Sequence, residues 1–363
     1  MSSASLPSLY TNWVEEWLGG SIPAETEATC QQCALLAEPA QPATRDLTRR
    51  IHPRTKCCGY YPSLANFQVG RILSESDPTA APARDVVAAR VQARFVATPL
   101  ALDVPPAYHL LYAKSPYMGS ALKLQCPYYV EELLGGACGI WRHRNAICLT
   151  WFCKHSRGQV GLTFWKALEY LLKQMEDALS TWCLTQLEVT DDSLTRILPD
   201  RHGDKTVFTP QELDEAVDEK AHRAVWGNWA GREAEFYREC GRLVSALSAQ
   251  EALEIGGVEV ALRLRLARRA YRALLSADLP RAVRPGNFRV QPLGDDQVQI
   301  VSYSEYSPLL LPAVVLNLLP YFQGRTVDEA LKAIDEQGQI ELEPALVRRL
   351  LDFEILVAVE ETC

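Results

Sequence analysis

GLTFWKALEYLLKQMEDALSTWCLTQL, residues 161–187, is the most strongly patterned stretch of the chain. Its apolar side chains recur mostly every three or four residues, which is the spacing of one face of an α-helix. The residues that form this face are Phe164, Leu168, Leu171, Leu172, Met175, Leu179 and Trp182. We therefore predict a long helix with a strongly buried face, and we expect it to serve as the scaffold of the fold.

The region before this helix, residues 1–158, is expected to be irregular. Proline and small residues interrupt it, for example at 74–85 and 103–109. Between them, residues 86–96 alternate apolar and other side chains in a way that suits a strand, with a short helix as the alternative. Weak regular structure around clustered cysteines is typical of a domain that a metal ion cross-links.

The pattern after the long helix stays helical to about residue 280. Thr209, Pro210 and Glu212 form a helix start signal, with threonine at the cap and glutamate three residues later. A further helix is predicted over 258–276 and carries Arg263, Arg265, Arg268, Arg269 and Arg272. These arginines form either a solvated helix face or a contact for an acidic partner.

The last part of the chain has the pattern of a small module. Residues 288–304 predict two strands around a Gly-Asp-Asp turn, and 311–325 predict a short apolar helix. Thr326 and Glu329 form a capping box that starts the next helix. The final segment is predicted to be a helix that runs into a strand.

We therefore predict an α+β fold with three parts. Residues 1–158 form an irregular, cysteine-rich metal-binding domain, residues 159–280 form a helical region, and residues 285–363 form a small winged-helix-like domain. The chain has 363 residues, of which 48% are hydrophobic and 23% are charged. This composition is typical of globular proteins, so a core can form without metal or disulfide support.

Charge and hydropathy exclude several classes of partner. The net charge of −8 and the lack of a Lys- or Arg-rich run argue against a nucleic-acid partner. No apolar run reaches the roughly 18 residues that a membrane span needs. The first residues lack the pattern of a secretion signal. We therefore expect a cytoplasmic protein with no membrane partner.

Eight of the eleven cysteines lie in the first 153 residues. In a reducing compartment, closely spaced cysteines are more often metal ligands or redox groups than disulfides. We predict that a metal site draws its ligands from Cys30, Cys33, Cys57, Cys58, Cys126, Cys138, Cys148 and Cys153. Cys183 and Cys240 lie in helical patterns and are expected to be buried as small apolar side chains.

The spacing of these cysteines leaves two kinds of metal open. Zinc takes four ligands in a tetrahedron, whereas an iron–sulfur cluster such as [4Fe–4S] also takes four thiolates but tolerates irregular spacing. Only one CxxC pair is present, at Cys30 and Cys33, so the irregular pattern favours iron–sulfur over zinc. Cys57 and Cys58 point to opposite sides of an extended chain, so one can ligate while the other packs, or both can serve one cluster.

Cationic and aromatic residues flank the cysteines. Our candidates for cofactor binding are Arg54 before the adjacent cysteine pair, Arg144 within CGIWRHRNAIC, and His155 after the last clustered cysteine. Cations lower the pKa of thiols and offset the charge of a thiolate-ligated centre. The alternative is that the two arginines are ordinary solvated charges and that His155 is a hydrogen-bonded residue without a role in cofactor binding. Other residues that lie close to these cysteines in the sequence are His52, Arg142, His143, Tyr60, Tyr61, Tyr128 and Tyr129. The tyrosines are expected to pack around the site.

The order CxxC, CC, CP and CxIxxxRxxxC resembles the YkgJ-like cysteine-cluster family, whose members are described as zinc- or iron-chelating. The matching residues are Cys30, Cys33, Cys57, Cys58, Cys126, Cys138 and Cys148, with Ile140 and Arg144 in the last element. The resemblance covers roughly residues 30–155. It departs from the family in the 23 residues between Cys33 and Cys57, which leaves open whether the CxxC pair joins the same site. Flagellin lysine methylases carry a similar arrangement, so an enzyme role is one implication.

The C-terminal pattern is similar to the PqqD-like winged-helix fold. FQGRTVDEALKAI (322–334) and LVRRLLDFEILV (346–357) carry this resemblance. In that family the edge of a hairpin pairs with a leader peptide by strand addition. The resemblance implies a peptide or protein partner for the C-terminal domain. A winged helix that only stabilises the larger domain is the alternative.

Sequence motifs for other common chemistries are missing. The sequence has no phosphate loop, no dinucleotide fingerprint, no HExxH and no GxSxG. Our leading hypothesis is an iron–sulfur protein that acts on a peptide or protein substrate, with no catalytic residue assigned. The alternatives are a non-catalytic zinc- or iron-binding protein and a peptide-binding adaptor.

Overall fold

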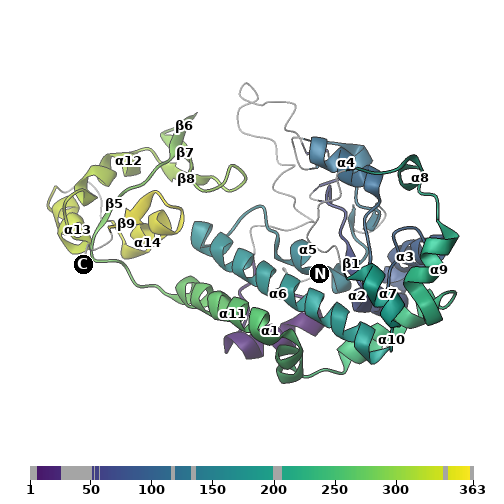
Figure 1. Cartoon of the computed structure of the whole chain (residues 1–363). Helices are drawn as coiled ribbons and strands as arrows, with labels where there is room; N and C mark the ends of the chain where they lie inside the picture. Colours follow the sequence, from purple (N-terminus) through teal and green to yellow (C-terminus); the bar gives the residue numbers. More distant parts are fainter. Residues whose placement is uncertain are drawn as a thin grey trace.

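The computed structural model describes residues 6–25, 51–52, 54–56, 58–115, 119–131, 136–198, 207–337 and 342–359. This part of the chain combines many helices with short strands, so the predicted α+β class is confirmed. Figure 1 shows a larger body of helices beside a smaller module that ends the chain. No helix in the described ranges is both long and apolar enough to cross a membrane.

The apolar side chains form two clusters. The larger cluster runs from Leu6 to Leu274 and includes residues from before and after the start of the long helix. The smaller cluster runs from Val283 to Leu356. The body and the C-terminal module therefore each have a hydrophobic core.

The predicted long helix is confirmed as α6 (Gly158–Gln186), and its apolar face is buried except for Trp182, which is partly buried. α11 (Ala249–Leu275) packs along α6, and α1 (Ser8–Leu18) packs against α11 (Figure 1). α11 begins nine residues before the predicted start at 258, because Ser248 caps its first turn. The two halves of α11 meet at a kink at Gly257.

Shorter helices and two-residue strands complete the body. The helices are α2 (Asn66–Leu73), α3 (Ala81–Ala93), α4 (Pro106–Lys114), α5 (Ala146–Thr150), α7 (Asp191–Ile197), α8 (Pro210–Leu213), α9 (Glu219–Trp226) and α10 (Glu233–Ser245). Antiparallel pairs are formed by β1 (Leu64–Ala65) with β2 (Ala101–Leu102), and by β3 (Tyr129–Val130) with β4 (Ala137–Cys138). Single 3-10 turns are η3 (Pro78–Ala80), η4 (Leu122–Leu124), η5 (Trp141–His143) and η6 (Gly227–Trp229).

The strand expected over 86–96 is wrong, because most of that segment lies in α3. The residues of α3 that are buried are Ala83, Val87 and Val91, at intervals of four. This spacing belongs to a helix face, and Pro82 in the first turn suits a helix start. The helical alternative was therefore the correct one.

The capping box at Thr209 and Glu212 is confirmed, but the helix that it starts is only four residues long. The tract then continues as separate helices, α9 and α10. Gly227 and Gly231 lie between them with positive φ values, which end α9 and redirect the chain.

The C-terminal module combines two small sheets and three helices. β6 (Arg289–Gly294), β7 (Gln297–Val301) and β8 (Leu309–Pro312) form an antiparallel sheet in that order, and β5 (Val283–Pro285) pairs with β9 (Leu356–Ala358). The helices are α12 (Val314–Leu318), α13 (Val327–Glu336) and α14 (Pro344–Asp352), with the 3-10 turn η7 (Leu319–Phe322) after α12. The predicted hairpin and the capping box of α13 are confirmed. β5 and β8 were not predicted.

A buried ionic group joins the module to the body. The guanidinium of Arg157 binds Asp352, which is 3% exposed, and donates to the carbonyl oxygens of Leu274 (2.6 Å) and Ser276 (3.1 Å) at the end of α11. Gly158 begins α6 with φ +50°, and a Cβ there would lie 2.3 Å from the carbonyl oxygen of Asp352. The close approach of α6 and α14 therefore requires glycine at this position.

We predict that Asp352→Ala lowers the free energy of unfolding by about 3 kcal/mol, because Arg157 and Arg348 both lose their carboxylate partner at a mostly buried position. Urea denaturation followed by tryptophan fluorescence measures this loss. The control is Glu235→Ala, which removes an exposed ion pair with Arg232 and is expected to change stability little. Equal effects of the two substitutions would contradict the role of Asp352.

Candidate functional site

Five of the eight predicted metal ligands lie in the described ranges. They are Cys58, Cys126, Cys138, Cys148 and Cys153, and none of the five forms a disulfide bond within the described part of the chain. Cys126 is buried and the other four are partly buried. The predictions for Cys30, Cys33 and Cys57 fall outside the described residues. Cys183 and Cys240 are fully buried in α6 and α10, as predicted.

A short backbone contact brings Cys58 and Cys126 together. The N–H of Cys126 donates to the carbonyl oxygen of Cys58 at 2.7 Å, although the two residues are 68 positions apart. The N–H of Cys58 in turn donates to Thr55 (2.8 Å). The buried Thr55 hydroxyl donates to the carbonyl oxygens of His52 and Gly119, so the segment before Cys58 is fixed to the body.

The β3–β4 pair brings Cys138 toward Cys126. Cys138 lies opposite Tyr129, which is three residues after Cys126. The N–H of Gly139 donates to the carbonyl oxygen of Tyr128 (2.8 Å) and continues the pairing. A Cβ at Gly139 would lie 2.6 Å from the Cβ of Ala83, so this close packing on α3 requires glycine.

The N-terminus of α5 places Cys148. The side-chain oxygen of Asn145 accepts from the N–H of Cys148 (3.0 Å), which is the usual geometry of an N-cap. The side-chain amide of Asn145 donates to the carbonyl oxygen of Ser63 (3.2 Å). One asparagine therefore links the helix that carries Cys148 to the segment that follows Cys58.

The electrostatics of Cys126 reflect its cysteine neighbours. Burial raises the pKa of the Cys126 thiol well above its usual range, and the nearby Cys138 and Cys148 raise it further. Each thiolate disfavours ionisation of the next, because like charges repel in a poorly solvated environment. The three thiols are therefore close enough to influence one another's ionisation.

Tyrosine rings lie beside this cysteine group. Tyr61 packs edge-on against Tyr108 (5.2 Å between ring centres) and against Tyr128 (5.9 Å). Burial raises the pKa of Tyr61 to about 12, and Cys126 adds to this shift. Arg90 lies 4.8 Å from the centre of the Tyr61 ring. Tyr108 in α4 was not among the predicted residues, because nothing in its local pattern marks it as close to the cysteines.

The three predicted cofactor-binding residues lie in different surroundings. Arg144 is buried, stacks 3.5 Å from the centre of the Trp141 ring and donates to the carbonyl oxygen of Cys148 (3.3 Å). Arg54 is exposed and forms an ion pair with Glu131. Of these two arginines, Arg144 is the one that contacts a candidate ligand, Cys148, directly.

His155 lies at the contact with the C-terminal module. It is 3% exposed, and its Nδ1 lies 3.4 Å from the hydroxyl of Tyr303. Burial lowers the pKa of His155 to about 4, and Lys166 adds to this shift. The imidazole is therefore neutral at physiological pH.

Arg142 and His143 are directed toward acidic residues after α2. Arg142 pairs with Asp77 at 2.8 Å, and the Nε2 of His143 lies 3.2 Å from Glu75. The charge of Arg142 is therefore balanced by a carboxylate, whereas burial lowers the pKa of His143 and favours its neutral form.

Glu176 is a residue of the site region that the sequence predictions missed. Its Oε1 atom accepts three hydrogen bonds, from the hydroxyl of Tyr10 (2.8 Å), the side-chain amide of Gln68 (2.7 Å) and the N–H of Ala146 (2.7 Å). Burial raises the pKa of Glu176 to about 8, although the hydrogen bonds oppose this shift. The carboxylate thereby fixes the first turn of α5, two residues before Cys148.

We predict that Glu176→Gln changes how stability depends on pH. The folded pKa of about 8 lies above the ordinary value of 4.5, so the folded chain holds an extra proton between these values. The free energy of unfolding of the wild type therefore falls as pH rises from 4.5 to 8. Glutamine keeps an acceptor oxygen without titrating, so the variant should gain stability relative to the wild type between pH 5 and pH 8.

Urea denaturation at pH 5 and pH 8 checks this prediction. Glu176→Ala is the matched comparison, because it also does not titrate but loses all three hydrogen bonds, and it should be about 2–4 kcal/mol less stable than Glu176→Gln at both pH values. A constant stability difference between Glu176→Gln and the wild type at the two pH values would contradict the raised pKa.

Among the described residues, no group of three or more His, Cys, Asp or Glu side chains is arranged to hold a metal ion. Comparison with protein-family models, with curated proteins and with solved structures finds no match for the chain. The YkgJ-like and PqqD-like resemblances therefore stay predictions.

Proposed function

We propose that the chain binds a thiolate-ligated metal centre in its cysteine-rich part and acts on a peptide or protein substrate. The observation that supports the metal proposal is that the chain segments carrying Cys58, Cys126, Cys138 and Cys148 are held next to one another. A backbone hydrogen bond, a strand pair and an asparagine cap join the segments that carry them. Three independent contacts of this kind suggest a site that needs these cysteines together.

An iron–sulfur cluster is the metal centre that we favour. The spacing of the cysteines is irregular, which a cluster tolerates better than a single zinc ion does. The buried Arg144 contacts the backbone of Cys148, and Arg90 lies over the neighbouring tyrosines. Positive charge of this kind offsets the negative charge of a thiolate-ligated cluster and tunes its potential.

The substrate proposal is based on the C-terminal module. β6 is an edge strand of its three-stranded sheet in the described part of the chain, and nearly all of its residues are exposed. An exposed edge offers unpaired backbone groups to an added strand. An extended peptide that pairs with β6 is therefore the partner we propose for this module.

Anaerobic purification tests the metal proposal. We expect brown protein with broad visible absorbance, iron and sulfide in elemental analysis, and a cluster signal by Mössbauer or EPR spectroscopy. Colourless protein with stoichiometric zinc would overturn the iron–sulfur assignment. Protein without any metal after purification and reconstitution would overturn the metal centre itself.

Cysteine variants locate the centre. Cys126→Ser, Cys138→Ser and Cys148→Ser should each lose most of the bound metal, because serine is a poor replacement for a thiolate ligand. Cys183→Ala and Cys240→Ala are the controls, since both residues are buried in the helical core. These two variants should keep the metal even where they lower the melting temperature.

The peptide proposal is tested by hydrogen exchange. Peptides selected from a display library on the metal-loaded chain should slow amide exchange in residues 289–294, because strand addition protects edge N–H groups. Protection elsewhere, with exchange in β6 unchanged, would contradict this binding mode.

A further inference from the structure

α11 has two faces with apolar side chains, and only one of them is covered. Its buried face packs on α6 and α1. On the outward side, Val258, Leu262 and Leu266 follow one another at intervals of four residues. These three side chains are 76%, 53% and 52% exposed. A row of exposed side chains at this interval forms a ridge of the kind that packs against another helix.

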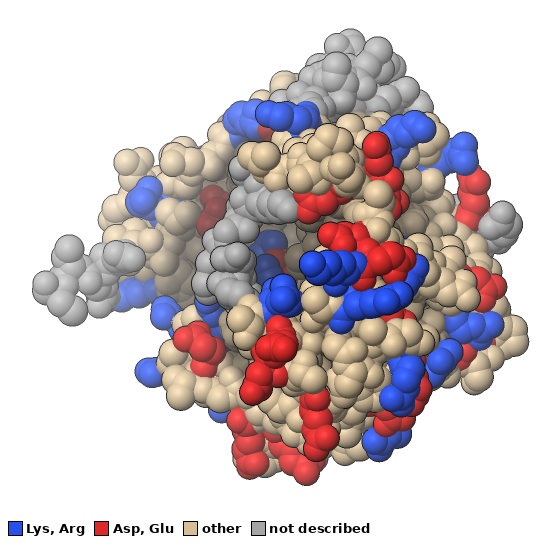
Figure 2. Space-filling model, turned by 45° about the vertical axis from the view of Figure 1, so that its right-hand side comes forward, with Lys and Arg blue, Asp and Glu red and all other residues tan. Residues whose placement is uncertain are grey.

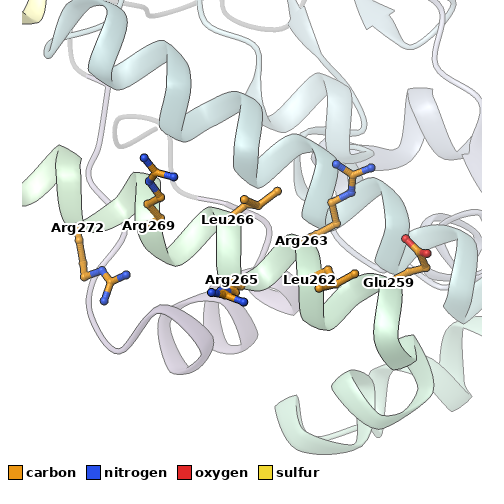
Figure 3. A pocket seen from close by; sticks show the side chains of 7 residues that line it. All are labelled: Glu259, Leu262, Arg263, Arg265, Leu266, Arg269 and Arg272. Carbon is orange, nitrogen blue, oxygen red and sulfur yellow. The ribbon is translucent and has the colours of Figure 1, made fainter. Parts of the chain in front are cut away.

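Four arginines surround this ridge. Arg263, Arg265, Arg269 and Arg272 project from α11 and line a groove of about 590 Å³ together with Leu262, Leu266 and one acidic residue, Glu259, at its end (Figure 3). None of the four forms an ion pair with any residue in the described ranges. Arg263 instead lies 5.5 Å from the centre of the Tyr170 ring.

Several other exposed arginines of the body are paired. Arg94, Arg232 and Arg242 each bind a glutamate. On the face shown in Figure 2, cationic and anionic side chains lie among one another. The neighbouring Arg268 has a structural role, because its Nε donates to the carbonyl oxygen of Trp17 (2.7 Å). The four arginines of the groove therefore gather positive charge, unpaired within the described residues, on one helix of a chain of net charge −8.

We infer that this face of α11 is a docking surface for an acidic amphipathic helix of a partner protein. Carboxylates of the partner would pair with the guanidinium groups, which bind carboxylates in a bidentate way. Apolar side chains of the partner would cover Leu262 and Leu266. The surface is separate from the proposed metal centre and does not depend on it.

A protein helix fits this surface better than a membrane or a nucleic acid does. A helix that lies on a bilayer buries a broad apolar face. α11 already covers its broad apolar face with α6, and only a narrow ridge is exposed. A nucleic acid would gain nothing from the exposed leucines, and the overall negative charge opposes its binding.

The test uses a synthetic 20-residue helix with glutamates flanking a leucine stripe, labelled with a fluorophore. Anisotropy titration with the full chain should show binding that weakens as salt is raised, because the contact is partly ionic. A second helix with lysine in place of each glutamate should bind much more weakly. Arg265→Glu/Arg269→Glu and Leu262→Asn/Leu266→Asn should each weaken binding of the acidic helix about tenfold or more.

A charge-matched variant serves as the control. Arg196→Glu/Arg223→Glu changes the net charge by the same amount at exposed positions on α7 and α9. This variant should bind the acidic helix nearly as well as the wild type does, and circular dichroism should show all three variants folded. Equal binding by the arginine variant of α11 and this control would overturn the inference.

Two further outcomes would also overturn the inference. One is binding to phosphatidylserine vesicles that depends on the arginines of α11, with no binding of the acidic helix. The other is self-association of the chain through this face, seen as a dimer in analytical ultracentrifugation that Leu262→Asn/Leu266→Asn abolishes.

Discussion

The buried carboxylate of Glu176 joins four parts of the larger body. It projects from α6 and accepts hydrogen bonds from α1, from α2 and from the first turn of α5. A buried acceptor with three donors stabilises the fold, because each donor would otherwise lose its partner away from water. The position of Cys148 depends on this interaction, since α5 begins at the residue that donates to Glu176. The packing of the scaffold helix and the geometry of the cysteine group are therefore connected through one side chain.

Sequence patterns that extend over a few neighbouring residues predicted several elements correctly. The apolar face of α6, the capping box of α13 and the hairpin of β6 and β7 all follow from residues close in sequence. Predictions were wrong or incomplete where a short apolar run is compatible with both a helix and a strand. Residues 86–96 were assigned to a strand although they lie mostly in α3, and the last two residues of β8 were included in an apolar helix predicted over 311–325. Periodicity alone does not separate strand from helix in such runs.

The candidate ligands could be named from the sequence, whereas the contacts between the segments that carry them could not be predicted. Cysteine spacing selected the candidate ligands, but the contacts that bring them together connect distant segments. Cys58 meets Cys126 through backbone groups, and the side-chain amide of Asn145 meets the carbonyl oxygen of Ser63; neither contact has a sequence signal. Glu176 did have a signal, because it follows Met175 within the apolar face of the long helix. A lone carboxyl group at such a position must be neutral or hydrogen-bonded. In the structure, Glu176 accepts hydrogen bonds from three donors.

The proposed metal centre and the C-terminal module share one short segment. Cys148 and Cys153 precede His155, which packs on Tyr303 of the module, and Arg157, which binds Asp352 of α14. Fewer than ten residues therefore separate the candidate ligands from both contacts of the junction. A metal that fixes this segment also fixes the residues that hold the module. Because the proposed peptide edge, β6, belongs to the same module, binding of the metal would favour the orientation of that edge relative to the cysteine group.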